Sequence, residues 1–128
     1  MQAELRALTR QDGWEIYAML QQMPRMENGF GNSAHGLEEA AFASWLERQE
    51  RMARGVGLEA GRVPQSVYWL YVDGAPVGMG KLRHRLNAGL RLSDGHIGYA
   101  IRPGCRGRGY GELLLQLLLE RAAALGLE

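Results

Sequence analysis

The sequence predicts one mixed α/β domain whose elements follow the order β-α-α-β-β-β-α. Two patterns carry this prediction. Apolar residues recur at three- and four-residue intervals in two separate segments, as they do on one face of a helix. After them, residues 67–72 are, apart from Leu70, β-branched or aromatic and lead into Asp73-Gly74, a dipeptide that suits a two-residue hairpin turn. No internal repeat or linker divides the 128 residues, so we expect residues 1–128 to form a single domain.

The N-terminal part is expected to contain a strand followed by a helix. Residues 3–8 are a short mixed stretch that suits a first strand. Thr9 and Asp12 have the spacing of an N-terminal helix cap, and Pro24 ends the helical period. These signals predict a helix over residues 12–23.

The next segments are predicted to be a loop and a second helix. Residues 28–36 are rich in glycine and small polar residues, which predicts a loop and a candidate lid over a site. Residues 37–54 carry a helical apolar period that ends at Gly55, so we expect the second helix there.

The C-terminal half is predicted to hold three strands and a helix. After the strand at residues 67–72 and its turn, a returning strand is expected over residues 76–83. A polar connection then leads to a strand over residues 95–101. Residues 109–125 are good helix formers, and Gly126 takes the position of a C-terminal cap.

Composition excludes several classes of protein. Fifteen basic and fourteen acidic side chains leave a formal charge of +1, so no whole-molecule field attracts nucleic acid or anionic lipid. The single cysteine, Cys105, excludes an internal disulfide, and nothing near Met1 resembles a secretory signal. The longest apolar run, residues 113–119, is interrupted by Gln116 and is too short to cross a bilayer. We therefore expect a cytoplasmic protein that binds neither membrane nor nucleic acid.

The strongest functional signal lies between the last predicted strand and the last helix. Gly107, Gly109 and Gly111 alternate there, just before the helix. Glycines let the backbone turn sharply and aim several N–H groups at one point, and the positive end of the helix adds to this anion site. Tyr110 follows Gly109 where a Walker loop needs lysine, and Glu112 stands where a dinucleotide fingerprint needs glycine.

This segment resembles the coenzyme A loop of the GNAT N-acetyltransferases, whose pattern of Arg or Gln, two residues, Gly, one residue, and Gly or Ala is matched by Arg106, Gly109 and Gly111. The strand GHIGYAI before it and the helix after it agree with the family. The resemblance implies a mostly antiparallel sheet flanked by helices, acetyl coenzyme A as cosubstrate, and a small-molecule or peptide primary amine as acceptor. It implies that the following residues bind the coenzyme: Ala100, Ile101, Arg106, Gly107, Arg108, Gly109, Tyr110 and Gly111.

Two residues are implied as catalytic. His96 stands where several members of the family carry the glutamate that deprotonates the amine, and an imidazole suits that work near neutral pH. Tyr99 is placed near the thioester, on the face expected to hold His96 and opposite Ile97. A packed, hydrogen-bonded histidine and an ordinary core tyrosine are the alternatives.

Other chemistry-bearing residues have weaker signals. His84 lies among basic residues, either lining the acceptor site or on a solvated edge. Arginines near Cys105 favour its thiolate, but no base accompanies it locally. The same arginines, Arg102, Arg106 and Arg108, either contact coenzyme phosphates or are solvated. His35, His84 and His96 lack metal-ligand spacing, so no metal is expected. Trp14, Trp45 and Trp69 are expected in the core.

Members of this family normally continue beyond the third helix with a further strand, a helix and more strands, which this sequence lacks. The resemblance therefore leaves an alternative: a catalytically inactive, truncated fragment that binds coenzyme A weakly or acts as a dimerising module. The last strand would expose an unpaired edge, and the last helix is apolar almost all round. These features predict a homodimer that pairs through the last strand and helix.

Overall fold

The computed structural model describes residues 2–27, 30–56, 64–84 and 97–125. Its centre is an antiparallel sheet with the strand order β1-β4-β5-β6. The bounds of these strands are β1 Ala3–Ala7, β4 Gln65–Val72, β5 Ala75–Arg83 and β6 Ile97–Ile101. A two-stranded hairpin, β2 (Met26–Glu27) with β3 (Phe30–Gly31), forms a separate small sheet, and β3 contacts β6. The predicted α/β class and the antiparallel sheet are thereby confirmed.

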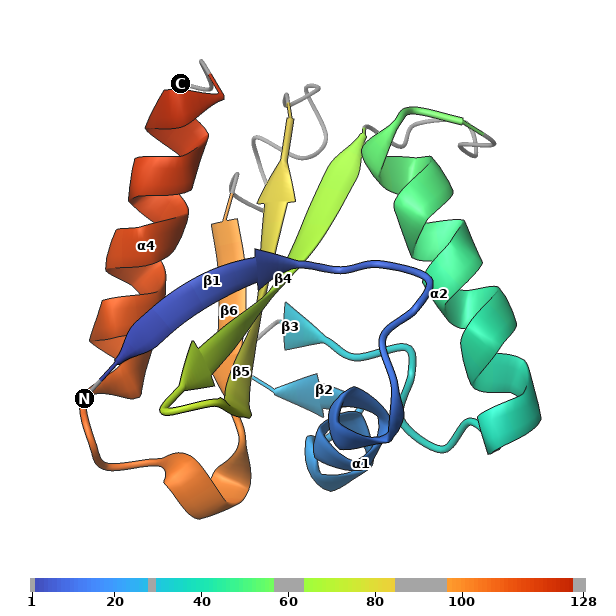
Figure 1. Ribbon diagram of the computed structural model, residues 1–128, viewed down its shortest axis with the longest axis horizontal. Coiled ribbons are helices and arrows are strands. Elements are labelled where there is room, and N and C mark those ends of the chain that lie inside the picture. The colour runs from blue at the N-terminus through green and yellow to red at the C-terminus, as the bar shows by residue number, and fades with distance from the viewer. Residues whose placement is uncertain (1, 28–29, 57–63, 85–96, 126–128) are drawn as a thin grey trace.

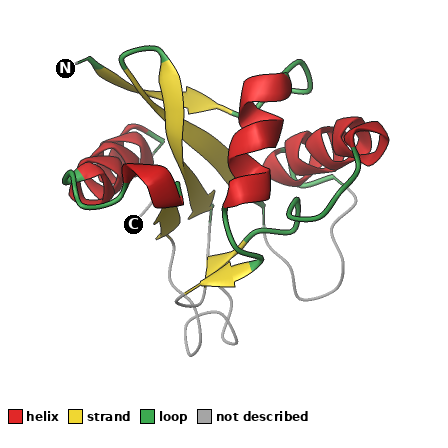
Figure 2. Ribbon diagram, turned by 90° about the horizontal axis from the view of Figure 1, so that it is seen from below, coloured by secondary structure: helices red, strands yellow, loops and turns green. Residues whose placement is uncertain are grey.

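Helices cover both faces of the sheet (Figures 1 and 2). The helices α1 (Trp14–Gln22) and α2 (Glu39–Ala53) pack on one face, around the buried Trp45 and Trp69. The helix α4 (Tyr110–Ala124) packs on the other face, through Leu114 and Leu118. None of the helices in the described ranges is long and apolar enough to cross a lipid bilayer.

The central hairpin β4–β5 follows the sequence pattern closely. Asp73 and Gly74 both have positive φ, 50° and 83°, as a two-residue turn between right-twisted strands requires. Residues of β4 alternate between the two cores, with Trp69 on the α1/α2 side and Leu70 on the α4 side. Because β4 is buried on both faces, its sequence is a continuous apolar run.

Two glycines of β5 set the position of α4. A Cβ atom on Gly80 would lie 2.8 Å from a methyl of Leu118, and one on Gly78 would lie 2.9 Å from Ile101 and 3.2 Å from Leu114. The helix therefore sits directly on bare backbone, closer than side chains on these positions would allow. This contact fixes the start of α4 next to the end of β6.

The segment predicted as a loop and candidate lid is instead pinned to the core in its described part. The Asn32 side-chain amide is buried and donates to the carbonyls of Leu20 and Met23, at 2.9 and 3.2 Å. Gln21 bridges the backbone of Ala34 and Gly36, at 2.9 and 2.7 Å. These contacts, together with the β2–β3 hairpin that was not predicted, make residues 30–36 part of the packed structure.

The chain between β1 and α1 also differs from the prediction. Thr9 and Asp12 bond each other in a turn, and the N-cap position of α1 is Gly13, which makes no side-chain cap. Asp12 instead accepts a 2.7 Å hydrogen bond from the Trp69 indole. Helix α1 therefore begins later than expected, at Trp14, which is 64% exposed rather than in the core.

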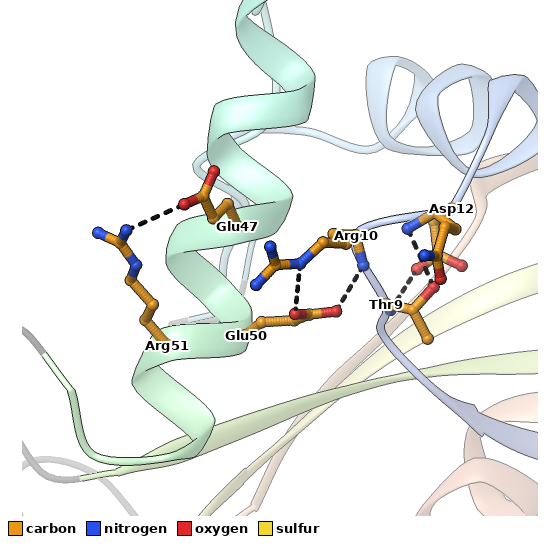
Figure 3. Close-up of polar contacts among 7 residues, drawn as sticks. Thr9, Arg10, Asp12, Glu47, Glu50 and Arg51 are labelled. Atoms are coloured by element: carbon orange, nitrogen blue, oxygen red, sulfur yellow. Dashed lines mark hydrogen bonds and ion pairs between the residues drawn. The ribbon is translucent and has the colours of Figure 1, made fainter.

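An ion pair ties this connection to α2 (Figure 3). The Arg10 guanidinium and backbone amide both donate to the Glu50 carboxylate, at 2.9 and 2.6 Å. These hydrogen bonds lower the pKa of the Glu50 carboxyl. One turn away, Arg51 pairs with Glu47 at 3.0 Å along the helix. Both pairs are at the surface, where such interactions contribute little stability.

We predict that Gly78→Val lowers the free energy of unfolding by about 1–3 kcal/mol, because the added methyl groups meet Ile101, Leu114 and a backbone carbonyl. Denaturant unfolding followed by fluorescence measures the change. Gly104→Ala is the matched control, since its Cβ meets nothing within 4 Å, and it should stay within about 0.5 kcal/mol of the parent. Equal stability of the two variants would contradict the close seating of α4.

Candidate functional site

The connection from β6 to α4 is a compact turn built by glycines. A short 3₁₀ turn, η1 (Pro103–Cys105), follows β6, and Gly107 and Gly109 then both have φ of +79°, in the left-handed region. Residues with a side chain rarely adopt this conformation. Gly109 is the N-cap of α4, so the second of these turns opens directly into the helix.

Backbone amides collect at this turn. The first bond within α4 runs from the Leu113 amide to the Gly109 carbonyl, at 3.2 Å. The amides of residues 107–112 have no hydrogen-bond acceptor in the described part of the chain, whereas those of Cys105 and Arg106 are used by the preceding turn. Unpaired amides at the start of a 15-residue helix, with its positive dipole end, are the donors that an anion site needs. The free amides expected from the glycines are present, except that the Arg106 amide bonds the Pro103 carbonyl. Anion binding by this turn stays a prediction.

A cleft of about 350 Å³ lies over this turn, and we call it the loop cleft. Its lining contains most of the residues that the sequence singled out as coenzyme-binding. The lining residues are Glu27, Tyr99, Ala100, Ile101, Cys105, Arg106, Gly107, Gly109, Tyr110 and Gly111. Arg108, which was also predicted, is exposed and does not line the loop cleft.

Strand β6 supplies further polar groups to the loop cleft. Among the described strands it pairs only with β5, and on its other edge the one backbone group bonded within the described residues is the Ile101 carbonyl, which accepts from Arg106 Nε. The Arg102 amide donates to the Val77 carbonyl at 2.8 Å, which shows which residues of β6 have backbone groups that bond β5. By the alternation of an antiparallel pair, the backbone groups of Ala100 point toward β5, and those of Tyr99 and Ile101 point outward.

The predicted face of Tyr99 is wrong. Ile97 and Ile101 pack in the core under α4, and the Tyr99 ring lies 3.7 Å from the Cβ position of Gly111, at the start of the same helix. Odd-numbered positions of β6 therefore share one face, as a period of two requires, and Tyr99 is on the side of Ile97. Tyr99 is 39% exposed and lines the loop cleft, so it is not a core tyrosine.

The side chain of Arg106 is occupied by protein groups. Its guanidinium forms an ion pair with Glu27 of β2 and donates from Nε to the Ile101 carbonyl at 3.2 Å. Arg102 is also engaged, with Gln22 at 2.6 Å. Arg106 thus connects the turn, the end of β6 and the β2–β3 hairpin, while its charge is offset by the carboxylate. A phosphate contact from Arg106 stays a prediction.

A second and larger cleft, of about 930 Å³, lies between α2 and the β2–β3 hairpin, and we call it the α2 cleft. Its apolar part includes Trp45, whose indole donates to Ser33 at 2.8 Å. The two clefts adjoin the same hairpin: Met26 and Gly31 line the α2 cleft, whereas Glu27 lines the loop cleft.

The candidate histidines His84 and His96 remain to be placed. His84 bonds Ser66 at 2.7 Å, and burial lowers the pKa of its imidazole. His84 is not among the residues that line the α2 cleft, and its side chain bonds Ser66 of β4 instead. His96, the predicted base, lies outside the described residues. Within residues 2–27, 30–56, 64–84 and 97–125, no group of three or more possible metal ligands is found.

Sequence reasoning missed Glu27 and the α2 cleft. Glu27 is 79 residues from Arg106, and a single carboxylate in a polar stretch carries no local signal of that pairing. The α2 cleft is assembled from the hairpin, α2 and the ends of β4 and β5, so only the fold brings its lining together.

Comparisons with known proteins agree with this geometry. The model of the acetyltransferase (GNAT) family matches residues 23–128. An acetyltransferase of the GNAT family from Streptococcus pneumoniae is similar in structure, with a TM-score of 0.59 and 19% identity, covering 98% of this chain and 70% of that one. An N-acetyltransferase from Staphylococcus aureus Mu50 has a TM-score of 0.55 and 16% identity, with coverage of 99% and 70%. No curated protein sequence matches the chain.

The structural similarities are below 25% identity and establish the fold alone, whereas the family model spans most of the sequence and includes both the turn and α4. On this evidence the chain belongs to the GNAT acetyltransferase family.

Proposed function

We propose that this protein transfers the acetyl group of acetyl coenzyme A to a primary amine. The observation that carries the proposal is the set of amides at residues 107–112, which have no acceptor among the described residues. Four of these residues line the loop cleft: Gly107, Gly109, Tyr110 and Gly111. Neutral donors at a helix start hold a diphosphate without a dedicated lysine. In this proposal Gly107, Gly109, Tyr110 and Gly111 hold the pyrophosphate, and Arg108 contributes charge from the rim.

The open edge of β6 fits the rest of the coenzyme. The pantetheine arm carries two amides, which can pair with a strand edge as another strand would. The outward amide and carbonyl of Tyr99 and the outward amide of Ile101 would make these bonds, because the Ile101 carbonyl already accepts from Arg106 Nε. Ala100 would line the arm. The thioester would then lie along β6, next to the Tyr99 side chain.

In this proposal the acetyl group passes directly from the thioester to the amine. The amine nitrogen attacks the thioester carbon, the C–S bond breaks, and the coenzyme leaves as a thiol after gaining a proton. The Tyr99 hydroxyl has no hydrogen-bond partner in the described chain and lines the loop cleft, so we assign it as the donor to the carbonyl oxygen or the departing sulfur. The base that removes the ammonium proton is proposed to be His96.

Substitution of Gly111 tests the anion site without disturbing the fold. The Cβ position of Gly111 lies in ordinary contact with Tyr99, at 3.7 Å, and a carboxylate in the first turn of a helix stabilises it. Gly111→Glu should therefore keep the melting temperature and lose at least about tenfold in affinity for acetyl coenzyme A, by charge repulsion. Calorimetric titration measures the affinity.

Gly111→Ala is the matched control and should bind the coenzyme within about threefold of the parent, because its methyl group adds no charge. Equal affinity for the parent and the Gly111→Glu variant would refute the assignment of the pyrophosphate to this turn.

The alternative, a non-catalytic module that dimerises, uses the same edge of β6. Leu119 of α4 is 49% exposed and adds apolar surface to that alternative. Because one row of backbone groups cannot pair with pantetheine and a second strand at once, the two functions compete. We predict that acetyl coenzyme A dissociates any dimer formed through β6, as measured by light scattering with and without the coenzyme. A dimer that binds the coenzyme at full affinity without dissociating would show that β6 is not its interface.

A further inference from the structure

The α2 cleft concentrates positive charge. Arg25, Arg48, Arg51 and Lys81 all line it, in a chain whose formal net charge is only +1. No aspartate or glutamate is among the described residues of its lining. The cations come from three separate parts of the fold: the α1–β2 connection, α2 and β5. A charge imbalance of this size in one concave surface favours an anionic ligand.

The individual contacts show which of these charges are available to a ligand. Arg51 is paired with Glu47 along α2, and Lys81 contacts the Gly31 carbonyl and the Phe30 ring. Arg48 has no hydrogen-bond or ion-pair partner among the residues that the structure describes. Arg25 has a single contact, at 3.5 Å, with the His35 carbonyl. Arg48 and Arg25 are thus the cations that the protein itself leaves least neutralised.

The same cleft contains further features of a ligand site. Trp45 and Met52 give it apolar surface beside the arginines. The Nδ1 atom of His35, another lining residue, is buried and has no hydrogen-bond partner in the described chain. Buried polar atoms normally have a hydrogen-bond partner, so this nitrogen could bond a polar group of a ligand. The volume, about 930 Å³, admits a small organic molecule.

We propose that the acceptor amine carries an oxyanion, a carboxylate or a phosphate, that Arg48 and Arg25 bind in the α2 cleft. The inference rests on the proposed acetyl transfer and adds the chemical class of the substrate. The β2–β3 hairpin that separates the α2 cleft from the loop cleft places the acceptor next to the coenzyme. Surrounding cations also lower the pKa of an ammonium group, so they favour the neutral, nucleophilic amine. Polyamines and other polycationic acceptors are disfavoured by the same charges.

Matched pairs of amines test the acceptor class. The release of free thiol from acetyl coenzyme A is measured with γ-aminobutyrate against butylamine, with O-phosphoethanolamine against ethanolamine, and with spermidine. In at least one pair the anionic member should have a kcat/KM about tenfold or more above its neutral partner, and spermidine should be the poorest acceptor. The pair that responds identifies the oxyanion as carboxylate or phosphate. Preference for neutral amines or for spermidine would overturn the inference while leaving acetyl transfer intact.

Variants of residues at α2 test whether the preference for anionic amines arises in the α2 cleft. Arg48→Gln should raise KM for the anionic amine about tenfold and leave the neutral amine and coenzyme affinity unchanged, because one charge-assisted hydrogen bond is lost. Arg54→Gln is the control: it removes the same charge from the same end of the helix at a residue outside the lining. Equal KM values for the anionic amine in the two variants would contradict the assignment.

Direct binding separates failure of the inference from failure of acetyl transfer. Amide chemical shifts are followed during titration with γ-aminobutyrate and O-phosphoethanolamine, with no coenzyme present. Shifts at Arg25, His35 and Arg48 that are absent in Arg48→Gln support the anionic acceptor even where turnover is absent. No shift at these residues with either probe would overturn the inference, whatever the coenzyme titration gives.

Discussion

The contact between α4 and the bare backbone of Gly78 and Gly80 is the interaction on which the loop cleft depends. Leu114 and Leu118 pack directly on these glycines, so the helix start is held beside the end of β6. The turn between them is then short, and two left-handed glycines are needed to make it. Its amides cannot bond within the helix or back to the strand, which leaves them for a ligand. A packing constraint in the core thereby leaves unpaired amides at the surface, where the proposed function places the pyrophosphate.

The two clefts differ in the kind of group that would attract an anion. At the loop cleft Arg106 is paired with Glu27, so in the proposed function the neutral amides and the helix dipole, with Arg108 at the rim, supply the attraction for phosphate. At the α2 cleft the charges are side-chain cations with few acidic partners. Donors of fixed geometry suit a cosubstrate that is always the same, whereas long arginine side chains suit the terminal oxyanion of an acceptor. The β2–β3 hairpin contributes to both.

Local patterns predicted most of the fold, and contacts between distant residues account for the rest. A few neighbouring residues are enough to predict three features: the Asp73-Gly74 turn, the apolar run of β4 and the glycine turn before α4. The hydrogen bonds of Asn32 and the Arg106–Glu27 pair depend on partners 9 to 79 residues away, which no periodicity records. The strands of the β2–β3 hairpin have two residues each, which is too short for a period to show. Trp14 was misplaced because it lies at the first turn of α1, where its ring contacts Tyr17 and not the core. Tyr99 and Ile97 are two residues apart in β6, so a period of two places both on the α4 face.

The central claim is that the amides of residues 107–112 receive the pyrophosphate of coenzyme A. Amide chemical-shift mapping during titration with coenzyme A tests it at the atoms concerned, and 3′-dephospho-coenzyme A distinguishes the pyrophosphate from the ribose phosphate. Both ligands should give their largest amide shifts at Gly107, Gly109, Tyr110 and Gly111, and smaller shifts along β6. Saturable binding that leaves these four amides unmoved, or no binding of either ligand, would contradict it.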